Sequence, residues 1–66
     1  MKIVVNGEEK NFAKSMTIAE ILEDLGITDM VMACAVNTEI VKKDSWANFS
    51  PNDGDKLEFL EFVGGG

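Results

Sequence analysis

A single amphipathic helix, marked at both ends, is the feature that most restricts how this chain of 66 residues can fold. Thr17 and Glu20 have the spacing of a capping box, in which each side chain accepts a hydrogen bond from the other residue's backbone amide. Gly26 follows as a residue that can end a helix in a left-handed conformation. Between them, apolar residues recur at helical spacing: Ile18, Ile21, Leu22 and Leu25. One helix with one apolar stripe needs a sheet to pack against, so the sequence predicts a two-layer α+β domain.

Short strand-like runs surround the helix and predict the sheet. They are residues 2–5, 8–12, 31–36, 40–41 and 56–63. The first two runs meet at Asn6-Gly7, a strong hairpin signal because both residues tolerate positive φ, and a dense turn signal at residues 51–55 precedes the last run. If the first and last strands are neighbours, they run parallel. This layout is a β-grasp (ubiquitin-like) fold, a mixed sheet of four to five strands covered on one face by one main helix.

Length and charge exclude several classes of function. A chain of 66 residues is one small domain that buries only about 60% of its unfolded surface, which leaves little volume for an enclosed active site. Six lysines and no arginine stand against twelve acidic residues, for a net charge of −6. This balance argues against nucleic acid and against anionic membranes as partners, and it favours a basic partner surface. We therefore expect a binding or carrier role for a protein that is monomeric by itself.

Cys34 is the only cysteine, and its neighbours in the sequence are apolar. A lone cysteine cannot form an internal disulfide, which fits a reducing compartment. Because the chain has no histidine to act as a base, we interpret Cys34 as a small buried hydrophobe. No signal peptide and no apolar stretch of membrane-spanning length is visible, so we expect a cytoplasmic protein.

The last three residues, Gly64-Gly65-Gly66, directly follow the apolar final strand. Glycine resists ordering, so we expect a β-grasp domain over residues 1–63 and a flexible tail over residues 64–66. Val63 to Gly66, fully extended, would span about 13–14 Å at about 3.3–3.6 Å per residue. Such a thread can enter a narrow slot in a partner and present a terminal carboxylate there. The alternative is a disordered end that has no role.

The alternation of the last strand predicts a docking surface beside this tail. Leu57 and Phe59 are expected to face the helix, which turns Leu60 and Phe62 to the outer face of the sheet. Val4 shares that outer face if the first and last strands pair. The alternative is that these are scattered surface hydrophobes. The predicted partner-docking residues are Val4, Leu60, Phe62 and Gly64.

Several pieces of the chain, spread over nearly its whole length, carry a family resemblance. They are residues 2–7, 17–22, 35–37, 39–41, Trp46, residues 53–55 and the terminal Gly65-Gly66. Each piece is short, but their order, spacing and end point together are specific. On these residues the chain resembles the ThiS family, the ubiquitin-like sulfur carriers of bacterial thiamin biosynthesis. It departs from the family pattern at Thr38, where members often have glycine, and at Lys42, where they often have proline.

The resemblance implies that the chain is a carrier on which partner enzymes act, with no catalytic residues of its own. A ThiF-like adenylyltransferase would use ATP to adenylate the Gly66 carboxylate, which would then be converted to a thiocarboxylate. The chain with its thiocarboxylate end would deliver the sulfur to a ThiG-like thiazole synthase. Gly66 would hold the sulfur, and Gly65 would leave clearance for threading and attack. The resemblance implies no bound cofactor and no metal.

Two other readings of the same residues stay open. The small subunit of molybdopterin synthase shares the fold and the Gly-Gly end but passes sulfur to a pterin precursor, and it is typically longer. A carrier for cysteine or methionine synthesis is a variant of this mechanism. The alternative from a different class is a non-catalytic β-grasp interaction module whose glycines are incidental. The region around Trp46 and Ile40-Val41 fits the thiamin carrier best.

Overall fold

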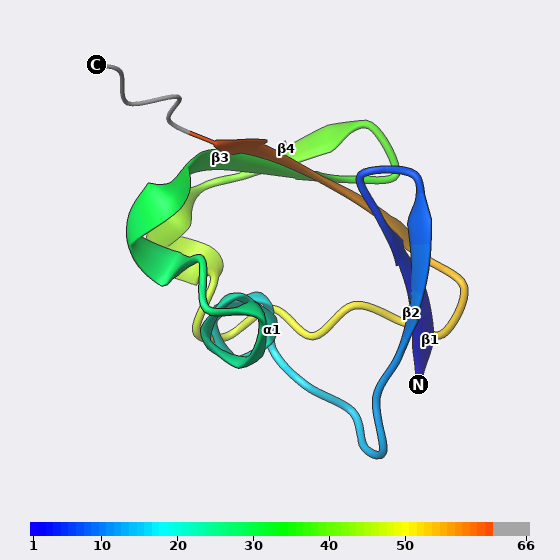
Figure 1. Ribbon diagram of the computed structural model, residues 1–66. Coiled ribbons are helices and arrows are strands. Elements are labelled where there is room, and N and C mark those ends of the chain that lie inside the picture. Colours follow the sequence, from blue (N-terminus) through cyan, green and yellow to red (C-terminus); the bar gives the residue numbers. More distant parts are fainter. Residues whose placement is uncertain (62–66) are drawn as a thin grey trace.

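The computed structural model describes residues 1–61, which form a five-stranded mixed sheet that curves around one α-helix (Figure 1). The elements are β1 (Lys2–Val5), β2 (Glu8–Asn11), α1 (Ile18–Leu25), η1 (Thr28–Met30), β3 (Val31–Val36), β4 (Glu39–Val41), η2 (Lys43–Ser45) and β5 (Lys56–Glu61), η being a 3₁₀ turn. The strand order is β2-β1-β5-β3-β4, with β1 and β5 parallel and all other neighbours antiparallel. The predicted β-grasp fold is confirmed.

Both hairpins turn through pairs of residues with positive φ. Asn6 and Gly7 join β1 to β2 at φ values of 48° and 84°, as the Asn-Gly signal predicted. Asn37 and Thr38 join β3 to β4 at 50° and 74°. Asparagine tolerates this region because its short side chain bonds locally, whereas a β-branched residue is strained there.

Helix α1 begins and ends where its signals place it. Thr17 Oγ1 accepts from the backbone amide of Glu20 at 3.2 Å, and Glu20 Oε1 accepts from the amide of Thr17 at 2.9 Å. The hydrogen bonds from the Thr17 backbone and hydroxyl lower the pKa of Glu20, because they favour its ionised form. The helix ends at Gly26, whose φ of 72° lies in the left-handed region.

The core lies between α1 and the inner face of the sheet. Within residues 1–61 the buried apolar side chains are Ile3, Val5, Ile18, Ile21, Leu22, Val31, Cys34, Val36, Trp46, Leu57 and Phe59. The predicted helical stripe is therefore a core stripe, although Leu25 at its end is only partly buried. Cys34, with 1% of its surface exposed, is a core residue as predicted.

β3 is not uniformly buried, although its sequence is apolar. Met32 is 59% exposed, because the register with β5 shifts between Val31 and Ala33. The shift leaves Met32 as an extra residue opposite the end of β5, as in a β-bulge. A local sequence pattern does not contain this information, since the shift depends on the partner strand.

The loop after β4 is anchored by Trp46. Its indole Nε1 donates to the carbonyl of Val41 at 2.9 Å, and its own carbonyl accepts from Ala19 N at 3.1 Å. The carbonyl of Phe49 accepts from Ile18 N at 2.9 Å. Amides of the first helical turn lack partners within a helix, so this loop satisfies two of them and fixes α1 against the sheet.

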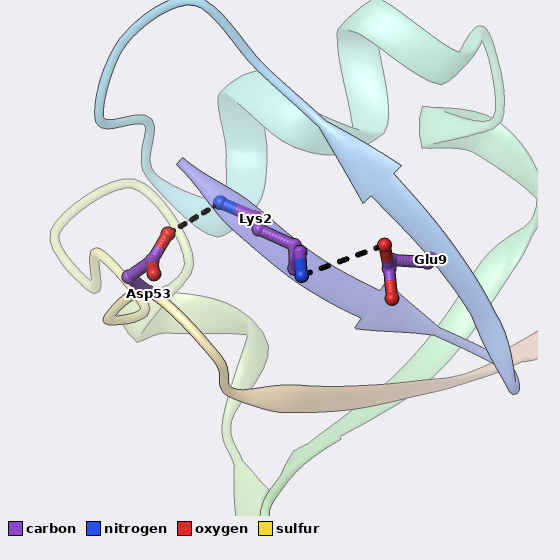
Figure 2. A network of polar contacts seen from close by, with 3 residues as sticks. All are labelled: Lys2, Glu9 and Asp53. Carbon is purple, nitrogen blue, oxygen red and sulfur yellow. Dashed lines mark hydrogen bonds and ion pairs between the residues drawn. The ribbon is translucent and has the colours of Figure 1, made fainter.

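The turn before β5 is tied to the start of β1. Lys2 N donates to Asp53 Oδ1 at 2.6 Å, and Gly54 N donates to the carbonyl of Lys2 at 2.7 Å. Figure 2 shows Lys2 between Asp53 and Glu9, whose carboxylate lies 3.6 Å from the ammonium group. The ion pair is exposed and contributes little to stability. The bonds of the Lys2 backbone to Asp53 and Gly54 instead fix the position along β1 at which β5 begins.

Candidate carrier end and docking face

β5 is the element that carries the chain toward the predicted reacting end. Leu57 and Phe59 face the core and are 1% and 6% exposed, so two buried side chains anchor the strand as predicted. Gly66 and Gly65, with their predicted sulfur-carrying role, lie outside the described residues. So do Phe62 and Gly64, with their predicted docking roles. These assignments stay predictions.

One asparagine side chain holds β5 from the side of β1. The amide of Asn6 donates to the carbonyl of Leu57 at 2.9 Å, and its side-chain Oδ1 accepts from the amide of Phe59 at 2.7 Å. The turn residue thus continues the parallel pairing one step beyond the end of β1.

A second asparagine holds the start of β5 from the side of β3. Asn37 N donates to the carbonyl of Lys56 at 2.7 Å, and Asn37 Oδ1 accepts from Lys56 N at 2.9 Å. Its side-chain Nδ2 also donates to Asp55 Oδ1 at 3.0 Å. Both turn asparagines therefore fix the register of the strand that leads to the tail, a role that the sequence reasoning did not assign to them.

The outer face of the sheet carries a patch of apolar side chains, the outer patch, formed by Ala33, Ala35, Ile40 and Leu60. Leu60 lies opposite Ala33 across the β3–β5 pair, and Ile40 lies opposite Ala35 across the β3–β4 pair. Leu60 is 63% exposed and Ile40 is 71% exposed. A shallow groove runs between them and reaches Asn6 at one side and Thr38 at the other. Large exposed apolar side chains grouped in this way favour contact with another protein.

Val4 shares the outer face with Leu60, as expected for paired strands, but it is not part of the outer patch. It lies beside Lys56 in the parallel register and is half-buried. Leu60 is four residues further along β5, about 13 Å at about 3.3 Å per residue, with Glu58 between them on the same face. The structure therefore does not bring these two predicted docking residues together.

The sequence reasoning missed Ile40, Ala33 and Ala35 as companions of Leu60. The available signal was the alternation of the second hairpin: Cys34 and Val36 are buried, so the alanines between them face outward. Which residue of β5 lies beside which alanine depends on pairing between distant segments. The alternation of residues within one strand does not determine this β3–β5 register.

Burial determines the chemistry of the thiol. Desolvation raises the pKa of Cys34 from its ordinary value of 9.0 to about 11, because a buried thiolate loses its hydration. Cys34 therefore stays protonated near neutral pH and is a poor nucleophile. Among residues 1–61 no group of three or more His, Cys, Asp or Glu side chains is placed to hold a metal ion. No helix in the same range has the length and apolar character needed to cross a membrane.

A family model for the ThiS family matches residues 3–66. The chain belongs to the ThiS family. The resemblance inferred from the sequence is thereby confirmed, and the matched region includes both the outer patch and the final glycines.

Known proteins similar to this ThiS-family chain differ in length. It is 32% identical to the sulfur carrier protein ThiS of Escherichia coli, with both chains covered completely. It is 52% identical to a thiazole synthase of Paramagnetospirillum magneticum, but spans only 20% of that protein. A crystal structure of the thiamine biosynthesis protein ThiS from Geobacter metallireducens superposes with a TM-score of 0.81 at 31% identity, again with both chains covered completely.

Proposed function

We propose that this chain is a sulfur carrier of thiamin biosynthesis that holds sulfur as a thiocarboxylate at Gly66. The chain is a protein substrate rather than an enzyme. The observation that carries this proposal is the match to the ThiS family over residues 3–66, supported by the similarity to the Escherichia coli carrier over both full lengths. Two similar proteins are named thiazole synthase, which supports thiazole formation as the destination of the sulfur.

The chemistry of the cycle explains the residue types. A carboxylate is a poor electrophile, so a ThiF-like partner would use ATP to convert it to an acyl-adenylate. Sulfur at the sulfide level from a donor then attacks the acyl carbon, the new C–S bond replaces the bond to AMP, and a thiocarboxylate remains. A ThiG-like thiazole synthase accepts this sulfur. The chain has no histidine, so in this proposal the partner enzymes supply acid–base catalysis. Gly65 and Gly66 have no side chains to obstruct threading or attack.

The proposal includes a reducing compartment, such as the cytoplasm, as the place where the chain works. A thiocarboxylate is readily oxidised, so it survives longest where thiols stay reduced. The buried, protonated Cys34 is compatible with such a location, since it needs no disulfide partner to be stable in the core.

Intact-mass spectrometry tests the proposal. The chain is incubated with ATP, a ThiF-like enzyme and a sulfur donor, and we expect a mass shift that corresponds to exchange of one oxygen for sulfur. A variant that lacks Gly66 should fold normally and support no thiazole formation. Glu9→Gln on β2, which β1 separates from β5 in the sheet, is the control and should react like the parent chain. Thiazole formation by the variant without Gly66 would refute the assignment.

A further inference from the structure

β5 is paired on both sides only along its first half. The amide of Asn37 donates to the carbonyl of Lys56, so the even-numbered residues of β5 direct their backbone groups toward β3. The odd-numbered residues direct theirs toward β1, as shown by the bond from Asn6 N to Leu57 O. β1, however, ends at Val5, which lies beside Leu57 in the parallel register.

The side chain of Asn6 closes the first unpaired position, because its Oδ1 accepts from the amide of Phe59. Three backbone groups follow on the same side of β5: the carbonyl of Phe59 and the amide and carbonyl of Glu61. No strand of residues 1–61 lies beside them. We call this stretch, Phe59–Glu61, the open edge. Figure 1 shows β1 and β2 beside the beginning of β5, while the end of β5 runs on beside β3.

The two outer edges of the sheet differ from the open edge. Exposed strand edges are usually protected by charge or by shortness, because unpaired backbone groups recruit other chains. β2 is a four-residue run in which Glu8, Glu9 and Lys10 are charged, and β4 has only three residues. The open edge is also short and includes Glu61, but it lies inside the sheet, next to the end of β1, and adjoins the outer patch through Leu60, whose side chain is 63% exposed.

We propose that an extended segment of thiazole synthase pairs with the open edge, adding a strand in the place that β1 leaves vacant. Unpaired backbone donors and acceptors along a strand select an extended polypeptide as their partner. Glu58 and Glu61 flank the site and the whole chain carries a charge of −6, so the incoming segment carries Lys or Arg side chains. In the Paramagnetospirillum protein, a segment 52% identical to this chain is part of a thiazole synthase, which supports that enzyme as the occupant. The inference rests on the proposed function and specifies how the partner holds the carrier.

Backbone pairing at this position has a direct consequence for sulfur delivery. Hydrogen bonds to Phe59 and Glu61 fix the direction of the chain just before the tail. A carrier aligned in this way presents its end to the synthase in one register, and correct placement of reacting groups is a large part of catalysis. The outer patch then supplies apolar contact area next to the backbone bonds.

Two edge prolines test the pairing. Glu61→Pro removes the amide at the open edge, whereas Glu61→Ala removes the side chain and keeps the amide. Glu9→Pro is the matched control, because the bond from Phe12 N to Met1 O directs the amide of Glu9 away from β1, at the outer edge of β2. No strand of residues 1–61 pairs with the amide of Glu61 or of Glu9, so thermal melting should change little. We expect Glu61→Pro to bind thiazole synthase about fivefold or more weakly than Glu61→Ala, as for loss of a backbone hydrogen bond, because both variants lack the carboxylate and only the proline lacks the amide. Glu9→Pro should bind like the parent chain.

Amide hydrogen exchange on the unmodified chain gives an independent readout. We expect the Glu61 amide to exchange fast in the free chain and much more slowly in the complex with thiazole synthase, while the Glu9 amide stays fast in both. Equal exchange at Glu61 in both states, unchanged binding by Glu61→Pro, or no binding by the parent chain would overturn the pairing. If the parent chain is converted to the thiocarboxylate and delivers its sulfur, any of these three results refutes only this inference. If it cannot be charged at all, the proposed function itself fails.

Discussion

Thr38 occupies a backbone conformation that its side chain disfavours. Its φ of 74° lies in the left-handed region, where the branched Cβ crowds the backbone at a cost of about 1–2 kcal/mol. Asn37 beside it adopts a φ of 50° with its side chain engaged by Lys56 and Asp55. Thr38 has no side-chain bond in the described part of the chain, so its strain is not offset locally.

Thr38→Gly should therefore stabilise the domain. Relief of the strain, reduced by the larger unfolded-state entropy of glycine, predicts a gain of about 1 kcal/mol in the free energy of unfolding. Urea denaturation followed by Trp46 fluorescence measures it. Thr38→Ala retains a Cβ and should gain much less. A midpoint for Thr38→Gly at or below that of the parent chain would contradict the strain argument.

Cys34 makes stability depend on pH in the alkaline range. Its pKa is raised by burial to about 11 in the folded state, against 9.0 for an ordinary thiol. The protonated Cys34 thiol makes its full contribution to the free energy of unfolding below pH 9, where the folded and the unfolded chain both hold the proton. This contribution is lost as pH rises toward 11, because the unfolded chain then releases the proton while the folded chain keeps it.

Cys34→Ala should remove this dependence. Two pKa units correspond to about 2–3 kcal/mol, so the stability difference between the parent chain and the variant should shrink by up to that amount between about pH 8 and pH 11. Comparing the two proteins at each pH cancels the contributions of all groups that they share. A difference that stays constant over this range would show that the folded and unfolded thiols titrate alike.

At the scale of elements, β5 separates two functions between its two faces. Its inner side chains hold the strand in the core, and Leu60 projects from the outer face with the outer patch around it. Replacement on one face should therefore affect stability, and replacement on the other should affect association.

Leu60→Ser and Leu57→Ser form a matched pair on that strand. Leu57→Ser should lose about 2–5 kcal/mol of unfolding free energy, as for truncation of a buried leucine. Leu60→Ser should change stability by less than about 0.5 kcal/mol yet weaken binding to the partner enzymes. Denaturation and calorimetric titration separate the two effects. If Leu60→Ser binds its partners as tightly as the parent chain, the outer patch is not a docking surface.

Elements with local signals were predictable from the sequence. The capping box of Thr17 and Glu20, the stop at Gly26 and the Asn6-Gly7 hairpin depend on residues within one turn of each other. The alternation of the last strand likewise placed Leu60 on the outer face. Features that join distant segments were not predictable. The bulge at Met32, the grouping of Leu60 with Ile40, and the side-chain bonds of Asn6 and Asn37 to β5 depend on strand register.

At the scale of the whole molecule, the same distinction applies to the candidate site. The family resemblance pointed to the terminal glycines and to a carrier role, and the family is confirmed over residues 3–66. The two-layer β-grasp architecture could be predicted, because a lone amphipathic helix needs one face of a sheet to cover it. The open edge could not be predicted. It exists because β1 is shorter than β5 and because of the register in which the two strands pair, and the local sequence does not determine that register.

The central position of β5 also governs when the domain can form. Its neighbours in the sheet are β1 and β3, and contacts such as Lys2 with Asp53 close loops of 51 residues. Until residues 56–61 have left the ribosome, the β1–β2 and β3–β4 segments have no strand to join them. Completion of the sheet thus waits for the last part of the domain to be synthesised, and contacts of such long sequence separation slow folding. An enzyme that recognises the finished sheet accepts only carriers whose synthesis has passed that point.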